Sequence, residues 1–237
     1  LVEECLVGRE TSLIAFTDGK TVVPMVTARD YKRAYDGDMG LNTGGMGCYS
    51  PSKFLDSKSI DKAIKTIVEP VVRAMSGEGR LYKGVLYTGL MLTAEGPKVL
   101  EFNARFGDPE TQVQLPLLKS DLVDIMQAVI DGTLDKAKIE WSKDACVGVV
   151  MASGGYPGSY KQGYPIKGLD RLDKETHVFH AGTKENEGEI CTAGGRVLTV
   201  VATGKTVAEA RSKAYRNVSR ISFENCHYRK DIAAEEA

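Results

Sequence analysis

The feature that most restricts the fold is an eight-residue segment, residues 99–106, in which polar and apolar side chains alternate. Because successive side chains of a strand point to opposite faces of a sheet, Glu101, Asn103 and Arg105 are expected to share one face. The other face carries only apolar side chains, those of Leu100, Phe102, Ala104 and Phe106. The segment therefore predicts a strand with one face on a hydrophobic core and one polar face.

Periodicity and turn residues predict the other elements. Residues 13–16 and 21–25 flank Asp18-Gly19, a dipeptide typical of a hairpin turn. Apolar residues at helical spacing predict a helix over residues 60–75. Thr206 and Glu209 have the spacing of a capping box at the start of a helix. By the same reasoning we expect strands over residues 84–93, 97–106, 146–153, 177–181 and 196–202, and helices over residues 122–130 and 206–218.

The composition argues against several classes of partner. With 31 Lys and Arg against 32 Asp and Glu, the formal net charge is −1, so no basic surface is expected for nucleic acid or an acidic membrane. No apolar run approaches the length of a membrane span. The five cysteines lie far apart without a CxxC pair, which argues against a zinc cluster or a disulfide framework and predicts a reducing cytoplasm. The chain opens on Leu1 without an initiator Met, so we expect a fragment.

The polar face of residues 99–106 suits metal-assisted chemistry on a nucleotide. A carboxylate and an amide oxygen two residues apart, as in Glu101 and Asn103, are ligands for a hard cation such as Mg²⁺, which takes nucleotide phosphates as further ligands. Arg105 can bind an anionic group such as a phosphate. The alternative is an ordinary solvated strand face. Two more acids in the following turn, Asp108 and Glu110, favour the functional interpretation.

Two other segments are weaker candidates. Residues 3–10 resemble a strand edge whose backbone can bind adenine while a nearby acid binds ribose, although the segment taken alone favours an ordinary edge strand with charged residues facing water. Residues 29–50 are predicted to form a long loop, and such loops tend to be functional. Its glycine-rich part, residues 42–47, lacks the P-loop pattern. The amides of that stretch are candidates for wrapping an anion, and the alternative is a flexible connector.

Taken together, these motifs resemble the phosphoribosylamine–glycine ligase (glycinamide ribonucleotide synthetase) family. Arg105-Phe106-Gly107-Asp108-Pro109-Glu110-Thr111-Gln112 matches the signature of that family. Residues 30–33 and 42–47 resemble its central loop. Four further stretches resemble its C-terminal domain: residues 151–158, 178–183, 194–198 and 228–232. The resemblance extends over essentially the whole chain, in order.

The resemblance implies an α+β fold. Residues 1–141 would form the back lobe of an ATP-grasp domain, mostly antiparallel sheet with helices, and residues 142–237 a small α+β C-terminal domain. It also implies a purine-biosynthesis enzyme that activates glycine with ATP as an acyl phosphate and joins it to 5-phosphoribosylamine, giving glycinamide ribonucleotide, ADP and phosphate. The implied cofactor is Mg²⁺ or Mn²⁺, and the implied state is a cytoplasmic monomer that binds neither nucleic acid nor a membrane.

The resemblance further assigns site residues by position. Glu101 and Asn103 match the metal ligands, and Arg105 would stabilise charge on the transferring phosphoryl group. The ATP-binding positions are Glu3, Glu4, Cys5 and Leu6, which match a hinge segment that contacts adenine, and Glu10, which matches the acid that binds ribose. The substrate-side positions are Lys32, Asn42, Thr43, Gly44, Gly45, Asp108 and Glu110.

Two departures from the pattern leave alternatives open. Many ATP-grasp proteins have a further acid where residues 90–92 stand, whereas this chain has Leu-Met-Leu. The N-terminal domain of the family and the front lobe, with its phosphate-binding Lys, have no counterpart, so we expect the isolated chain to be inactive. The other interpretations are a different ATP-dependent carboxylate–amine ligase, or a non-catalytic fragment that binds nucleotide or acts as a scaffold.

Overall fold

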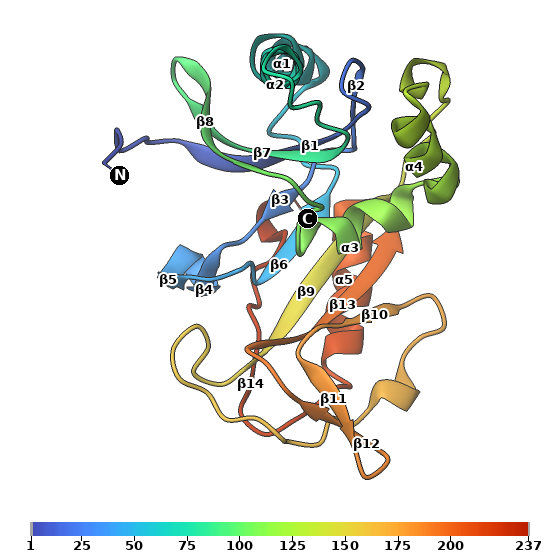
Figure 1. Ribbon diagram of the computed structural model, residues 1–237. Helices are drawn as coiled ribbons and strands as arrows, with labels where there is room; N and C mark the ends of the chain where they lie inside the picture. Colours follow the sequence, from blue (N-terminus) through green and yellow to red (C-terminus); the bar gives the residue numbers. More distant parts are fainter. Residues whose placement is uncertain (1, 237) are drawn as a thin grey trace. The chain divides into compact units, whose positions relative to one another are not determined.

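The computed structural model describes residues 2–236, which divide into two compact units (Figure 1). Within these residues, unit 1 contains residues 2–29, 51–107 and 118–142, and unit 2 contains residues 30–50, 108–117 and 143–236. The units interleave along the chain, because residues 30–50 and 108–117 pack with the C-terminal part. The assignment of residues 1–141 and 142–237 as family domains stays a prediction.

Unit 1 is built on a four-stranded sheet with the order β2-β1-β7-β8. Its strands are β1 (Arg9–Thr17), β2 (Val22–Pro24), β7 (Gly84–Thr93) and β8 (Gly96–Asn103), and all neighbouring pairs are antiparallel. The predicted hairpin at Asp18-Gly19 and the strand predicted over residues 84–93 are confirmed, whereas the strand predicted over residues 97–106 ends at Asn103. The predicted helix is also confirmed, as the consecutive segments α1 (Ser57–Ala63), η2 (Ile64–Val68, a π-helix) and α2 (Glu69–Gly77).

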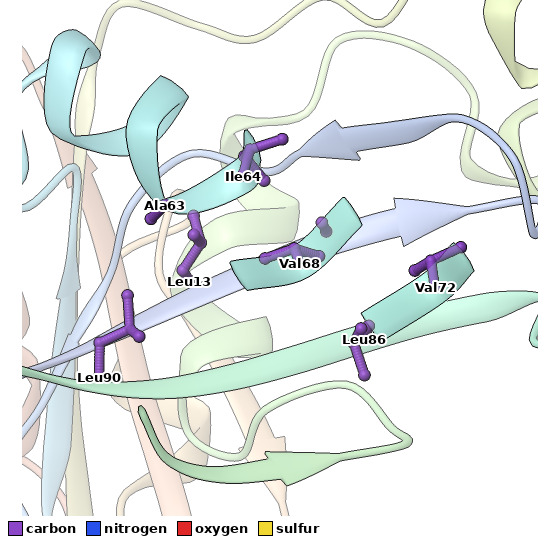
Figure 2. Close-up of a cluster of buried hydrophobic side chains, with 8 residues drawn as sticks. Leu13, Ala63, Ile64, Val68, Val72, Leu86 and Leu90 are labelled. Carbon is purple, nitrogen blue, oxygen red and sulfur yellow. The ribbon is translucent and has the colours of Figure 1, made fainter. Parts of the chain in front are cut away.

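The core of unit 1 lies between these helices and one face of the sheet (Figure 2). From the sheet come Leu13, Ala15, Leu86 and Leu90. From the helices come Ala63, Ile64, Val68 and Val72. Each of the eight is at most 7% exposed. The apolar side chains that recur at helical spacing in the sequence therefore form the stripe that covers the sheet.

The apolar face predicted for residues 99–106 is only partly buried, and this expectation was wrong in two respects. Phe102 is 40% exposed, because β8 is an edge strand. The ladder also stops at Asn103 and contains a bulge: Glu101 pairs with Gly89 but Val99 pairs with Leu90, which leaves Leu100 as the extra residue. Beyond the ladder, the Phe106 ring packs edge-on against Phe16, with centroids 6.3 Å apart.

The remaining elements of unit 1 are α4 (Leu122–Asp131) and η4 (Leu134–Lys136). Asp121 caps α4 by accepting a hydrogen bond from the Val123 amide, and Gly132 ends it in the left-handed conformation. The hairpin turn is anchored to η4, because the Asp18 carboxylate accepts hydrogen bonds from the amides of Thr21 and Leu134. No helix among the described residues has the length and apolar character needed to cross a membrane.

Unit 2 is built on a sheet with the order β10-β13-β9-β6-β3, to which β14 adds beside β9. These strands are β3 (Arg29–Asp30), β6 (Gly47–Ser50), β9 (Ala145–Ser153), β10 (His177–His180), β13 (Arg196–Gly204) and β14 (Cys226–His227). Helix α5 (Val207–Val218) contacts β9 and β13, while α3 (Glu110–Gln114) and η3 (Leu115–Leu117) contact β9. The smaller elements are β4 (Arg33–Tyr35), η1 (Asp36–Asp38), β5 (Met39–Asn42), η5 (Leu169–Arg171), β11 (Thr183–Asn186), β12 (Glu189–Thr192) and η6 (Ala234–Glu236).

The predicted capping box is present at the start of α5. The Thr206 hydroxyl accepts a hydrogen bond from the Glu209 amide at 3.2 Å. The Glu209 carboxylate accepts one from the Lys205 amide at 2.8 Å, one residue before the cap. The Thr206 hydroxyl thus pairs with a first-turn amide that has no intrahelical partner, whereas the Glu209 carboxylate binds the amide before the cap and not the Thr206 amide of the usual capping box.

The prediction of a long loop over residues 29–50 was wrong, because the segment contains β3, β4, β5 and β6. Its turn is fixed by distant residues: the Gly37 amide donates to the Asp231 carboxylate, and the Asp36 carboxylate accepts from the Lys230 amide. Because these partners lie 194 residues away, local sequence patterns did not reveal the ordered structure.

Candidate functional site

One face of the unit 1 sheet carries three of the residues predicted to bind ATP or metal, namely Glu10, Glu101 and Asn103. In the strand register Ser12 lies opposite Gly89, which lies opposite Glu101, and Tyr87 lies opposite Asn103. Residues that face each other across strands share a face. That face is turned away from the helices, since Leu13 of the helix-covered core lies opposite Thr88. Glu10 of β1 belongs to the same polar face by alternation.

Glu101 and Asn103 form the centre of this face. The Asn103 side-chain amide donates to the Glu101 carboxylate at 3.0 Å, so both side chains leave β8 on the same side, as the alternation predicted. Gly89 lies beneath them, and a Cβ there would stand 3.2 Å from the Glu101 Cγ. A glycine at this position therefore leaves room for the carboxylate over the sheet.

The donors fit a hard divalent cation, since a carboxylate and an amide oxygen are ligands of Mg²⁺ and Mn²⁺. Two side chains leave most of six positions for phosphate and water. In the part of the chain that the structure describes, no group of three or more His, Cys, Asp or Glu side chains is arranged to bind a metal. Of residues 90–92, Leu90 belongs to the core, and Met91, opposite Glu10, is the one on the polar face.

The other unit 1 candidates lie at the borders of this face. Glu3, Glu4 and Cys5 are exposed and Leu6 is partly buried, in a segment without regular secondary structure before β1. The Glu4 carboxylate lies 3.5 Å from Lys98 Nζ of β8. Arg105 lies just beyond the end of β8, is exposed, and donates to the Phe106 carbonyl at 2.9 Å.

The substrate-side candidates all fall in unit 2. They are Lys32, Asn42, Thr43, Gly44, Gly45, Asp108 and Glu110. The Asp108 side chain is 49% exposed, whereas Glu110, the first residue of α3, is almost fully buried. Burial raises the pKa of the Cys48 thiol, and the nearby Glu110 and Asp30 carboxylates raise it further. Glu110 therefore belongs to the interior of unit 2.

The glycine-rich stretch does not present its amides to an anion, so that expectation was wrong. Four consecutive amides already donate within the protein: Thr43 to the Lys32 carbonyl, Gly44 to the Tyr156 hydroxyl, Gly45 to the Thr43 hydroxyl and Met46 to the Tyr31 carbonyl. The glycines serve close packing instead. A Cβ on Gly45 would stand 2.4 Å from Pro109 Cδ.

Two residues of this region were missed by the sequence reasoning. Arg196 donates to the carbonyls of Gly44 and Asp108, at 2.7 and 2.9 Å, and to the Asp108 carboxylate at 3.1 Å. Tyr156 accepts the Gly44 amide at 2.9 Å. The available signal was a single large polar side chain inside each of two glycine-rich turns, residues 154–158 and 194–196.

The fold and the polar sheet face define the class as ATP-grasp. The family model for the ATP-grasp (A) domain of phosphoribosylglycinamide synthetase matches residues 1–111, and the model for the C domain of the same enzyme matches residues 146–235. The chain belongs to the phosphoribosylglycinamide synthetase family. The resemblance inferred from the motifs is thereby confirmed.

Similar proteins carry a consistent name. A phosphoribosylamine–glycine ligase from Caldanaerobacter subterraneus is 54% identical over 99% of this chain, and one from Halalkalibacterium halodurans is 51% identical over 99%. The crystal structure of a phosphoribosylamine–glycine ligase from Thermotoga maritima, 38% identical, matches 98% of this chain and 57% of its own with a TM-score of 0.88. The chain spans 56% and 54% of the lengths of the two relatives.

Proposed function

We propose that the protein acts in the ATP-dependent ligation of glycine to 5-phosphoribosylamine, in purine biosynthesis. The observation that carries the proposal is the polar sheet face with Glu10, Glu101 and Asn103, in a chain 54% identical to a phosphoribosylamine–glycine ligase. In the proposed reaction the glycine carboxylate attacks the γ-phosphorus of ATP and ADP leaves. The amine of phosphoribosylamine then attacks the acyl carbon of glycyl phosphate, and phosphate leaves.

In unit 1, Glu101 and Asn103 would bind Mg²⁺ or Mn²⁺ through a carboxylate and an amide oxygen. When bound, the cation supplies neutralisation of charge on the phosphates. We assign Glu10 to the ribose hydroxyls and residues 3–6 to adenine, with Cys5 and Leu6 acting mainly through the backbone. Arg105, exposed beyond β8, would bind the transferring phosphoryl group.

In unit 2, we assign Lys32, Asn42, Thr43 and Asp108 to the substrates, with Gly44 and Gly45 keeping the close packing of the stretch. Glycine and phosphoribosylamine both bring an amino group and an anionic group, so a lysine and a half-exposed carboxylate are chemically suited to them. Glu110 is buried, so we assign it to the packing that supports these residues and not to direct contact with a substrate. The predicted cytoplasmic location is compatible with five free cysteines, and a monomer is the proposed state.

A chimeric enzyme tests this function. The homologous region of the Caldanaerobacter relative is replaced by this chain, and product from isotopically labelled glycine is followed by mass spectrometry. We expect glycinamide ribonucleotide and ADP in equal amounts, dependent on phosphoribosylamine. The 237-residue chain alone is assayed in parallel and is expected to give no turnover.

Controls separate the competing interpretations. The unmodified relative, assayed beside the chimera, reports on the substrates and conditions. A panel of other amino acids and amines distinguishes a different carboxylate–amine ligase. A chimera that folds with the thermal stability of its parent but forms no product with any panel member would favour a non-catalytic fragment and contradict the proposal.

A further inference from the structure

Arg196 connects two unit 2 segments that are far apart in sequence. One guanidinium nitrogen donates to both the Gly44 and Asp108 carbonyls, at 2.7 and 2.9 Å, and the second donates to the Asp108 carboxylate at 3.1 Å. The partners lie 152 and 88 residues from Arg196. A planar guanidinium can make such divergent contacts at once, which a lysine ammonium does with less geometric control.

The contact depends on glycines at both ends. A Cβ on Gly44 would stand 2.9 Å from Arg196 Cζ, so the guanidinium lies directly against the Gly44 backbone. A Cβ on Gly195 would stand 2.2 Å from Tyr156 Cδ2. The Tyr156 ring therefore packs on the turn before Arg196, and its hydroxyl accepts the Gly44 amide. Both polar groups of Gly44 are thus bound by side chains from residues 154–158 and 194–196.

The Asp108 carboxylate is fixed from two sides. One oxygen accepts from Arg196, and the other accepts from the Gln112 side-chain amide at 2.8 Å. The Arg196 side chain is 21% exposed and directs three hydrogen bonds at protein atoms. Its contacts therefore serve to orient Asp108 and Gly44.

We propose that Arg196 is a positioning residue, which together with Tyr156 fixes Asp108 and residues 43–45 in the one arrangement that receives the substrates. The inference rests on the proposed function for the substrate role of these segments. The fixed arrangement itself belongs to unit 2 and is testable in the 237-residue chain without catalysis.

The first experiment measures backbone amide hydrogen exchange in the 237-residue chain. Arg196→Gln is expected to speed exchange at residues 43–46 by about tenfold or more, as loss of hydrogen bonds to a charged group implies, and to leave β9 unchanged. Tyr156→Phe should speed exchange at the Gly44 amide alone, and Arg196→Lys should give exchange rates between those of Arg196→Gln and wild type.

The matched control is Arg220→Gln, since Arg220 also makes three hydrogen bonds within unit 2, to Arg171, Asp173 and Asn217. Unchanged exchange at residues 43–46 in a folded Arg196→Gln variant overturns the proposal.

The second experiment measures kinetics in the chimeric enzyme. Arg196→Gln is expected to raise KM for glycine or phosphoribosylamine about tenfold while KM for ATP stays unchanged, with partial rescue by Arg196→Lys. If Arg196 only stabilised the fold, the substitution would not raise KM for glycine or phosphoribosylamine selectively. An equal rise in KM for ATP would therefore overturn the positioning role. A wild-type chimera that shows no ligase activity refutes the proposed function instead. The hydrogen-exchange result alone then decides whether Arg196 fixes residues 43–46.

Discussion

The Asn103 amide nitrogen donates to the Glu101 carboxylate over 3.0 Å, and the two side chains stand on one face of β8. This bond holds the carboxylate in place and leaves the Asn103 amide oxygen for another partner. We therefore propose that the pair binds a cation that prefers oxygen ligands.

The first prediction concerns metal binding by this pair. Glu101→Gln keeps the shape of the side chain but removes its charge, so we expect Mn²⁺ affinity in the presence of ATP to fall about tenfold or more in the chimeric enzyme. Titration followed by electron paramagnetic resonance measures it. Glu95→Gln, at the β7–β8 turn beside Lys98, is the control.

Removal of the metal by chelation should abolish turnover in the chimeric enzyme, and added Mg²⁺ or Mn²⁺ should restore turnover. Equal Mn²⁺ affinity in wild type and Glu101→Gln would exclude Glu101 as a ligand.

The second prediction concerns Gly45, whose φ is +114° and whose added Cβ would stand 2.4 Å from Pro109 Cδ. Gly45→Ala is expected to lower the free energy of unfolding by about 3 kcal/mol, from left-handed backbone strain and overpacking together. Gly163→Ala is the matched control, since Gly163 has a φ of +90° with no atom within 4 Å of an added Cβ. Gly163→Ala should lower the free energy of unfolding by only about 1 kcal/mol. Urea unfolding of the chain gives both values, and equal losses would show that the close approach is unimportant.

The third prediction concerns Arg229, which is 1% exposed and pairs with Asp231 at 2.6 Å and with Asp38 at 2.8 Å. Asp231→Asn would leave the buried guanidinium poorly compensated. We expect a loss of about 3 kcal/mol at neutral pH, at the lower end for buried pairs because Asp231 is partly exposed. Asp170→Asn, at an exposed position, is the control and should change stability little.

The same pair predicts a pH dependence. Burial acts to raise the pKa of Asp231, but hydrogen bonds from Arg229 and the Gly37 amide lower it to about 2. A carboxylate whose pKa is lower in the folded than in the unfolded state stabilises the fold above the unfolded pKa, near 3.9. That contribution is lost as the pH falls through about 2. The stability difference between wild type and Asp231→Asn should therefore shrink between about pH 4 and pH 2, and a constant difference over this range would contradict the assignment.

The fourth prediction concerns the cap of α5. Thr206→Ala removes the oxygen that accepts the Glu209 amide and should cost about 1 kcal/mol in thermal or urea unfolding. Thr206→Ser keeps that oxygen and is expected to stay close to wild type. A Thr206→Ser loss as large as that of Thr206→Ala would assign the effect to the methyl group and not to the cap.

The elements that the sequence predicted correctly depend on neighbours close in the chain. The helix over residues 60–75 followed from its apolar spacing, and the hairpin followed from Asp18-Gly19. The alternation around Glu101 and Asn103 correctly placed both on one face. Each of these patterns is local, because a helix repeats every 3.6 residues and a strand every two.

The failures have one cause, which is dependence on distant residues. Strands β3 to β6 are only two to four residues long, too short for a clear alternation pattern, and the turn between β4 and β5 is bound by Asp231 and Lys230. The exposure of Phe102 follows from the position of β8 at the edge of its sheet, which the alternation of a single strand does not reveal.

By itself, the sequence determined the family of this protein, most of its secondary structure and the face on which Glu101 and Asn103 lie. Only the tertiary structure decided that the amides of residues 43–46 are already bound and that Arg196 reaches Gly44 and Asp108. The physical reason is that backbone periodicity is set within a few residues. The hydrogen bond between Arg196 and Gly44, which lie 152 residues apart, forms only when the strands and turns that carry the two residues have come together.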